Sequence, residues 1–278
     1  MAIVQIKVDT PRFSRLSKFQ LSVFYLFELI RLKSLACLPT YATSPSTNTS
    51  QVIIMTDVKP TILVFGPEES EGSLKEPKEK ANVYHASLTK FGAADKLLDD
   101  HPTPRAIFIL DPAIVTPDCG GFSDRITDYT FGGGTVVLGG SFSLYVSQSD
   151  FDTWMEEEWN LPWKCGNRER TRVVFQSSAV GPRDFWRDGL VAAYTHDGQL
   201  LKNVSPSDSW YATLPNMTND PVQTSVACAK YGEGWLGWTG DFRNRDETIA
   251  AVRVMMDLNT KHEENGTPPK LISKLLDG

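Results

Sequence analysis

The chain has 278 residues, of which 41% are hydrophobic and 22% are charged, the composition of a globular protein with a substantial core. Its formal net charge is -6, which argues against nucleic acid as a main partner, because phosphate recognition needs a basic surface. The four cysteines, Cys37, Cys119, Cys165 and Cys228, include no C-x-x-C pair and predict neither a disulfide framework nor a zinc site.

The first 54 residues differ in character from the rest. Their apolar stretch, Leu21–Ile30, is interrupted by Ser22 and Glu28 and is too short to span a bilayer, so we expect no membrane association. A basic, Ser-rich and acid-poor leader fits a transit peptide, and it fits a non-functional extension as well. We predict a leader or disordered extension over 1–54, one domain over 55–260 and a polar tail over 261–278. The expected location is cytoplasmic, or mitochondrial if the leader is a transit peptide.

Short apolar segments dominate the first half of the domain. Thr61–Phe65, Arg105–Leu110 and Thr135–Leu138 are nearly continuous apolar runs, typical of strands buried on both faces of a parallel sheet. Ala81–Phe91 and Ser123–Phe131 have the spacing of amphipathic helices. Two strand–helix units in succession indicate a doubly wound sheet.

The second half adds a helix, several strands and a final hairpin. The expected elements are a helix over Ser149–Trp159, strands over Thr171–Gln176, Gln199–Val204, Ser209–Thr213, Ser225–Lys230 and Trp235–Thr239, and a helix over Glu247–Leu258. Tyr231–Gly234 forms the turn between the last two strands. The predicted fold class is therefore α/β, with a doubly wound, mainly parallel sheet, helices on both faces and a C-terminal antiparallel hairpin.

Polar and glycine-rich segments follow the buried strands. In a doubly wound sheet, ligands bind at the carboxyl ends of the strands. The segments to inspect are Gly66–Glu69, Asp111–Thr116 and Gly139–Ser143. We predict one ligand-binding pocket there, with Phe142 or Trp238 as an apolar wall. Its predicted residues are Asp111, Gly139, Gly140, Ser141, Phe142, Trp238 and Asp241.

Several motifs resemble those of the class I glutamine amidotransferase-like superfamily, and of its ThuA-like group in particular. They are Gly132–Val137 leading into Gly139–Ser141, and the closing Gly232–Asp241 hairpin. The pattern is most similar to that of uncharacterised fungal members, through Gly133–Val137, Phe142–Ser143, Trp163–Gly166, Arg170–Thr171 and Gly240–Asp241. The resemblance covers roughly 60–258 and implies a flavodoxin-like sheet.

The resemblance also implies where catalytic residues belong. Active members carry a cysteine at the sharp turn after the central strand and a histidine after the final strand. Here those places hold Gly140–Ser141 and Thr239–Asp241. Amidotransferase chemistry needs a thiolate with a basic partner, and neither is present at the matching positions. We therefore expect an amidotransferase-like protein without the Cys–His pair, which binds a small molecule or a protein partner at the strand ends.

A divergent hydrolase that uses Ser141 or Asp241 is the alternative. Ser141 follows a glycine-rich strand-to-helix turn, as in a nucleophile elbow, but G-G-S-F-S is not G-x-S-x-G, and a serine there can equally cap the next turn. Asp241 fits an acid, or a residue that ends a strand and accepts from backbone amides. Cys165 lies near Arg168 and Arg170, which can lower a thiol pKa, although a structural role is the simpler interpretation.

The remaining candidates point to no cofactor and no metal. The four histidines, His85, His101, His196 and His262, show no metal-ligand spacing. Glu68 and Glu69 fit a solvated charge run better than a catalytic carboxylate. Nucleic acid is not expected as a partner, and the formation of a homo-oligomer stays open.

Overall fold

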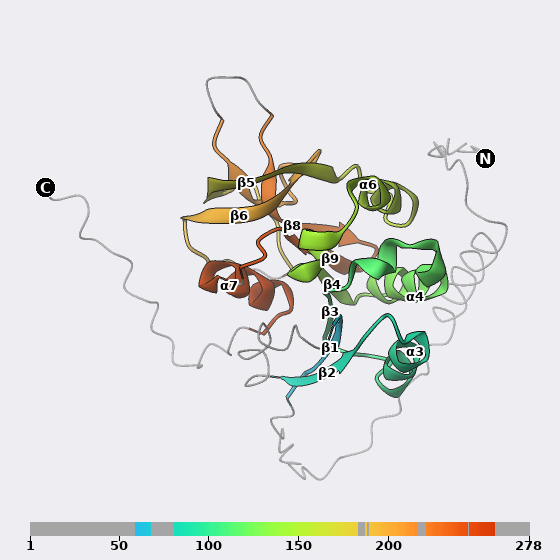
Figure 1. Cartoon of the computed structure of the whole chain (residues 1–278). Helices are drawn as coiled ribbons and strands as arrows, with labels where there is room; N and C mark the ends of the chain where they lie inside the picture. Colours follow the sequence, from blue (N-terminus) through green and yellow to red (C-terminus); the bar gives the residue numbers. More distant parts are fainter. Residues whose placement is uncertain are drawn as a thin grey trace, which may run out of the picture. The chain divides into compact units, whose positions relative to one another are not determined.

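The computed structural model of the protein describes residues 59–67, 81–182, 187, 189–215, 221–243 and 245–258 (Figure 1). All of them belong to one compact unit, Asp57–Gly278. The predicted leader and the predicted tail lie outside the described residues, so those domain boundaries stay predictions. No helix in the described part of the chain is long and apolar enough to cross a membrane.

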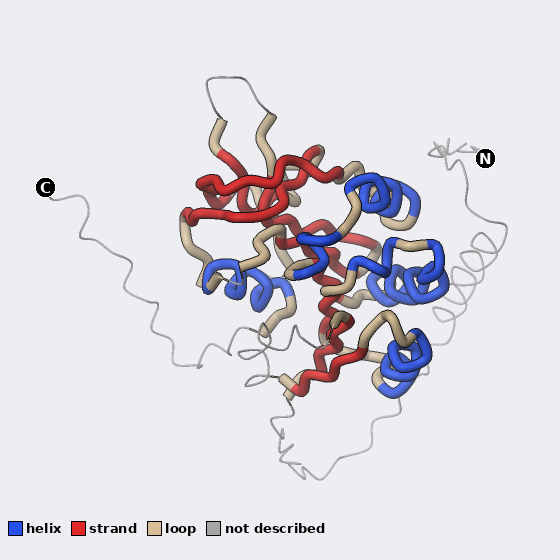
Figure 2. Tube along the Cα trace, in the orientation of Figure 1, coloured by secondary structure: helices blue, strands red, loops and turns tan. Residues whose placement is uncertain are grey.

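The described strands form a single mixed sheet (Figure 2). They are β1 (Thr61–Phe65), β2 (Asn82–Ala86), β3 (Ala106–Ile109), β4 (Thr135–Leu138), β5 (Lys164–Phe175), β6 (Ala193–Lys202), β7 (Ser209–Thr213), β8 (Thr224–Tyr231) and β9 (Gly234–Thr239). Their order across the sheet is β2-β1-β3-β4-β9-β8-β6-β5-β7. The first five of these strands, β2 to β9 in that order, run parallel to one another.

The other half of the sheet is antiparallel and closes on itself. β8 pairs with β6, β6 with β5, β5 with β7, and β7 again with β8. These four strands therefore form a closed unit, joined to the parallel strands through the β8–β9 hairpin. The prediction of a doubly wound, mainly parallel, flavodoxin-like sheet is wrong, because five of the nine pairings between the described strands are antiparallel.

Helices cover the two faces of the parallel strands unequally. They are α3 (Phe91–Asp100), α4 (Gly120–Phe131), the short α5 (Ser141–Tyr145), α6 (Gln148–Glu157) and α7 (Asp246–Met255), together with the 3-10 turns η2 (Pro112–Val115) and η3 (Pro117–Cys119). In Figure 1, α3, α4 and α6 lie on one side and α7 lies on the other. A single described helix on the second face is a further departure from a doubly wound arrangement.

The core has two layers because side chains alternate along each strand. Leu63 and Phe65 of β1 point into the layer under α3, α4 and α6, whereas Ile62 and Val64 point toward α7. β3 divides its residues in the same way. All four of those β1 side chains are at most 1% exposed, which explains why the sequence of this strand is apolar without interruption.

Most expected elements are present, but one has the wrong type. The predicted helix over Ala81–Phe91 is a strand, β2, followed by a turn and then by α3. β2 lies at the edge of the sheet and alternates between more and less exposed side chains, so its apolar content is low. Leu88, which suggested a helical face, is buried in the turn after the strand instead.

Candidate functional site

The carboxyl ends of β3, β4 and β9 meet at one edge of the sheet, because these three strands are adjacent and parallel. The segments that leave the strands are linked by hydrogen bonds. The amide of Gly139 donates to the carbonyl oxygen of Ile109 at 3.2 Å. The hydroxyl of Ser143 donates to Gly140 at 3.0 Å and lies 3.4 Å from the carbonyl oxygen of Gly240. Segments about a hundred residues apart in the sequence are thus neighbours at this edge.

Gly140 forms a sharp turn between β4 and α5. Its backbone has φ 56° and ψ -125°, a conformation that residues with side chains rarely adopt. A Cβ atom at this position would lie 2.8 Å from Cδ2 of Leu110. In a nucleophile elbow the strained residue of such a strand-to-helix turn carries the nucleophile. Here that residue has no side chain.

Ser141, the next residue, is partly exposed at the start of α5. Its hydroxyl donates a short hydrogen bond, 2.6 Å, to the carbonyl oxygen of Leu110. No hydrogen bond joins it to a histidine or a carboxylate in the part of the chain that the structure describes. The hydroxyl therefore ties the end of β4 to the end of β3.

Asp111 has a capping role at the end of β3. It is 9% exposed, and its Oδ1 accepts a hydrogen bond of 2.9 Å from the amide of Ala113 in the first turn of η2. Asp111 directly follows Leu110, whose carbonyl oxygen accepts the hydrogen bond from Ser141.

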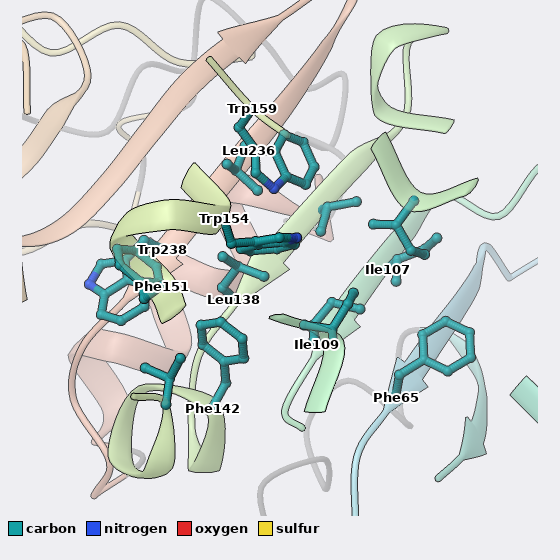
Figure 3. Packing of buried hydrophobic residues seen from close by; sticks show 14 of the residues in the cluster. Phe65, Ile107, Ile109, Leu138, Phe142, Phe151, Trp154, Trp159, Leu236 and Trp238 are labelled. Carbon is teal, nitrogen blue, oxygen red and sulfur yellow. The ribbon is translucent and has the colours of Figure 1, made fainter. Parts of the chain in front are cut away.

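Phe142 and Trp238 lie in the aromatic core beneath the edge (Figure 3). Both side chains have 0% exposure, and their ring centroids are 6.1 Å apart with the edge of one ring against the face of the other. Phe151 packs against both rings, at 6.3 Å from Phe142 and 5.1 Å from Trp238. In this arrangement the two predicted wall residues fill the core and present no surface to a ligand.

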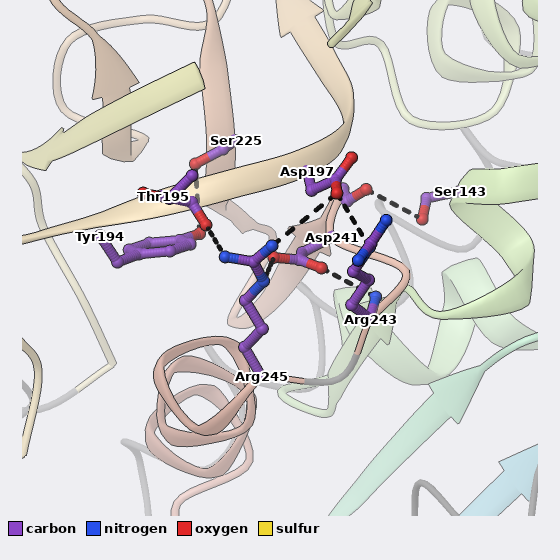
Figure 4. A network of polar contacts seen from close by, with 9 residues as sticks. Ser143, Tyr194, Thr195, Asp197, Ser225, Asp241, Arg243 and Arg245 are labelled. Carbon is purple, nitrogen blue, oxygen red and sulfur yellow. Dashed lines mark hydrogen bonds and ion pairs between the residues drawn. The ribbon is translucent and has the colours of Figure 1, made fainter. Parts of the chain in front are cut away.

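Asp241 follows β9 closely, forms an isolated antiparallel bridge with Gly198 of β6, and is 1% exposed (Figure 4). One carboxylate oxygen accepts from the amide of Arg243 at 2.8 Å, and the other lies 3.6 Å from Nε of Arg245. Burial raises the pKa of Asp241, and the amide of Arg243 and the charge of Arg245 oppose that rise. Arg243 and Arg245 also reach Asp197 of β6, at 2.8 and 3.8 Å. The carboxylate thus joins the end of β9 to β6 and to the start of α7.

His196 of β6 is a buried histidine that we did not place near this edge. Its ring is 0% exposed, and an added Cβ atom at Gly240 would lie 3.3 Å from its Cε1. Neither ring nitrogen makes a hydrogen bond of good geometry within the described residues, although the backbone of Gly198 and Gln199 lies near enough to favour the charged form. Burial nevertheless lowers the pKa of His196 to about 4, so the ring is neutral at pH 7.

A sequence signal for His196 existed in the alternation of β6. Tyr194 and His196 are buried whereas Thr195 between them is exposed, which is the period of a strand. The predicted strand begins only at Gln199 and leaves this alternation out. His85, which falls in the predicted helix over Ala81–Phe91, lies instead on the edge strand β2.

The described cysteines are free thiols of low reactivity. Cys119 and Cys228 are buried, and burial raises the pKa of both. Burial, with a contribution from Asp152, raises the pKa of Cys165 to about 12, and the charge of Arg168 offsets little of that rise. The raised pKa favours the structural interpretation of Cys165 over its activation by the nearby arginines. Cys37, Glu68 and Glu69 lie outside the described residues.

Among the residues that the structure describes, no group of three or more His, Cys, Asp and Glu side chains is arranged to hold a metal ion. The arrangement at the strand ends combines neutral hydroxyls bonded to backbone carbonyls with one buried carboxylate paired to arginine. Such groups fix backbone segments and offer hydrogen bonds. They do not form a nucleophile–base pair.

Comparisons with known proteins give similarity of fold at low identity. No protein-family model matches the sequence, and a search of curated proteins finds no match. A protein from Bacteroides uniformis described as ThuA-like has 10% identity and a TM-score of 0.48, over 78% of this chain and 95% of that one. A cytoplasmic protein from Salmonella typhimurium has 10% identity and a TM-score of 0.49, over 71% and 98%.

A β-galactosidase from Bacillus circulans is similar as well, with 11% identity and a TM-score of 0.47 over 72% of this chain. The chain spans only 30% of that enzyme. With identities near one residue in ten and TM-scores below 0.5, none of these similarities supports an inference about activity or substrate. The expected likeness to fungal proteins stays a prediction.

Proposed function

We propose that the chain is an amidotransferase-like protein that lacks the Cys–His pair and has no amidotransferase activity. We propose also that it binds a small molecule or a protein partner at the carboxyl ends of β3, β4 and β9. One observation carries the proposal. The strained position of the strand-to-helix turn, where a nucleophile belongs, is Gly140, and Leu110 occupies the space that a side chain there would need.

The surrounding polar groups support the non-catalytic part of the proposal. Ser141 and Ser143 donate to backbone carbonyl oxygens, and Asp111 accepts from a backbone amide, so each has a structural task. Cys119 is near enough for Asp111 to contribute to its raised pKa, but it is 1% exposed and burial is the main cause. A thiol of that kind is a poor nucleophile.

A hydrolase that uses Ser141 or Asp241 is the second candidate. The observation in its favour is a neutral imidazole, His196, beside the Gly240–Asp241 segment. Against it, His196 has no exposed surface, and the hydroxyl of Ser141 is bonded to Leu110. A general base must reach the proton that it removes, and this imidazole does not touch Ser141 in the described structure.

Turnover assays separate the two candidates. We expect the purified protein to release no ammonia from glutamine and to hydrolyse p-nitrophenyl acetate no faster than its Ser141→Ala variant. Ser177→Ala, a change at an exposed serine in the turn after β5, is the matched control. Ester or amide hydrolysis that disappears in Ser141→Ala or Asp241→Asn, and persists in Ser177→Ala, would contradict the non-catalytic proposal.

A further inference from the structure

Strand β5 carries three arginines at alternate positions, Arg168, Arg170 and Arg172, and all three are exposed. Alternate residues of a strand point to the same side, at a spacing of about 7 Å. Val173, of the opposite parity, has 0% exposure. The three guanidinium groups therefore line one outward face of the closed antiparallel unit.

The neighbouring strand β6 supplies one acidic residue to this face. Cross-strand pairing sets Arg168 opposite Gln199, Arg170 opposite Asp197 and Arg172 opposite Thr195. Glu169 pairs with Gly198 and has the other parity. Asp197 is therefore the one carboxylate that the paired part of β5 and β6 presents on this side.

Asp197 is already engaged by other arginines. Its Oδ2 lies 2.8 Å from Nε of Arg243 and 3.8 Å from Arg245, and the Asp197 side chain is 15% exposed (Figure 4). Arg243, whose side chain is 58% exposed, thus contacts the residue that pairs with Arg170. We call Arg168, Arg170, Arg172 and Arg243 the arginine surface. Within the described residues, Arg170 and Arg172 make no ion pair.

One end of the arginine surface joins the candidate site. The guanidinium of Arg168 donates to the carbonyl oxygens of Ser143 and Leu144, at 3.3 and 2.6 Å, which orients it. Tyr145, the next residue, is 71% exposed. Arginine and tyrosine are both enriched at the energetically dominant positions of interfaces.

The charge pattern selects the chemistry of the partner. Guanidinium groups about 7 Å apart lie within the screening length of about 8 Å at physiological salt, so they repel one another until an anion lies between them. Carboxylates match the donor geometry of arginine. A long polyanion such as nucleic acid would also be repelled by the rest of the chain, whose net charge is -6. A short acidic segment interacts mainly with the local arginines.

We propose that the arginine surface binds an extended acidic segment of a partner protein, with carboxylates at alternate residues. An extended segment repeats its side chains with the same period of two as β5, so successive carboxylates face successive arginines. This inference rests on the proposed binding function and names the chemical class of the partner.

Fluorescence anisotropy of the full-length protein tests the proposal. The probe is a short labelled peptide in which Glu alternates with Thr, compared with the same composition in two blocks, with a Lys/Thr peptide and with a single-stranded oligonucleotide. We expect the alternating acidic peptide to bind most tightly and its affinity to fall as salt is added. The Arg170→Gln, Arg172→Gln double variant should bind it at least about tenfold more weakly.

The double variant Lys90→Gln, Lys96→Gln is the matched control, because it makes the same change in net charge at exposed positions away from β5. Thermal unfolding of both variants checks that they fold. No binding of the acidic peptide, equal loss in both variants, or tighter binding of the oligonucleotide would each overturn the proposal. Hydrolytic turnover that depends on Ser141 would instead overturn the non-catalytic function and leave the peptide result standing, so the two failures are distinct.

Discussion

At the scale of single residues, Gly140 is a position where the backbone tolerates a side chain poorly. Its φ of 56° is unfavourable for other residues, and Leu110 stands 2.8 Å from where a Cβ atom would lie. We expect Gly140→Ala to lower the free energy of unfolding by about 1–3 kcal/mol. Urea denaturation measures the change. Gly121→Ala, in α4 with open space around it, should be neutral or stabilising by up to about 1 kcal/mol. Equal effects at both glycines would show that the turn is not strained.

His196 predicts a pH dependence of stability. Burial lowers its pKa from 6.5 to about 4, so the unfolded chain binds a proton that the folded chain does not between those values. Stability from this group is therefore full above about pH 6.5 and is lost as the pH falls toward 4, by up to about 3 kcal/mol. The raised pKa of Asp241 acts in the opposite sense, because its folded form holds a proton more readily than the unfolded form does.

Denaturation at a series of pH values checks the His196 prediction. The His196→Gln variant removes the titrating group, and its stability should change less between pH 6.5 and 4 than that of the native chain. His101→Gln, on the partly exposed residue after α3, is the control. If His196→Gln retains the full loss of stability on acidification, another group is responsible.

At the scale of elements, the sequence locates strands well when both of their faces are buried. β1 and β4 have the predicted bounds and β3 is slightly shorter, because their residues are apolar without interruption and end at Gly or Asp. β2 was mistaken for a helix because an edge strand has one exposed side and few apolar residues. β5 and β6 are longer than expected for a related reason. Their exposed halves carry Arg168 to Arg172 and Thr195 to Asp197, which give no apolar signal.

Pairing between elements was harder to predict than the elements themselves. The closure of the antiparallel unit depends on β7 contacting both β5 and β8, with shifts of register on the β8 side. Such closure depends on long-range contacts and on local shifts of strand register. The alternation of apolar and polar residues along a strand does not encode either of them. The sequence therefore predicts strands in this region but not how they pair.

The candidate site was predicted in part, for the same reasons. The sequence predicts that Gly139–Ser143 and Asp241 lie at one edge, because adjacent parallel strands have their carboxyl ends on the same side of a sheet. The structure has β4 and β9 adjacent and parallel, with Ser143 next to Gly240. Side-chain direction was not readable, so Phe142 and Trp238 were assigned to a pocket wall although they point into the core. His196, Arg243 and Arg245 were missed because they reach the edge from β6 and from the approach to α7.

At the scale of the whole molecule, stability depends on two apolar layers that share the central strands. The first layer includes Leu63, Ile107 and Trp238, and the second includes Val64, Phe108 and Met255. All buried residues of both layers fall between Ile62 and Leu258. Within the described part of the chain, removal of a central strand would therefore expose both layers at once.

The extent of the layers predicts which part of the chain folds by itself. We expect a chain that begins at Met55 to be soluble and to unfold in one cooperative thermal transition, with a midpoint close to that of the full chain, because both layers are complete within it. Differential scanning calorimetry measures the transition. A chain that begins at Ala81 is the control. It lacks β1, which pairs with β2 and β3 and contributes four side chains at most 1% exposed, so it should not fold cooperatively. Aggregation of the chain from Met55, or the loss of its transition, would show that the first 54 residues belong to the core.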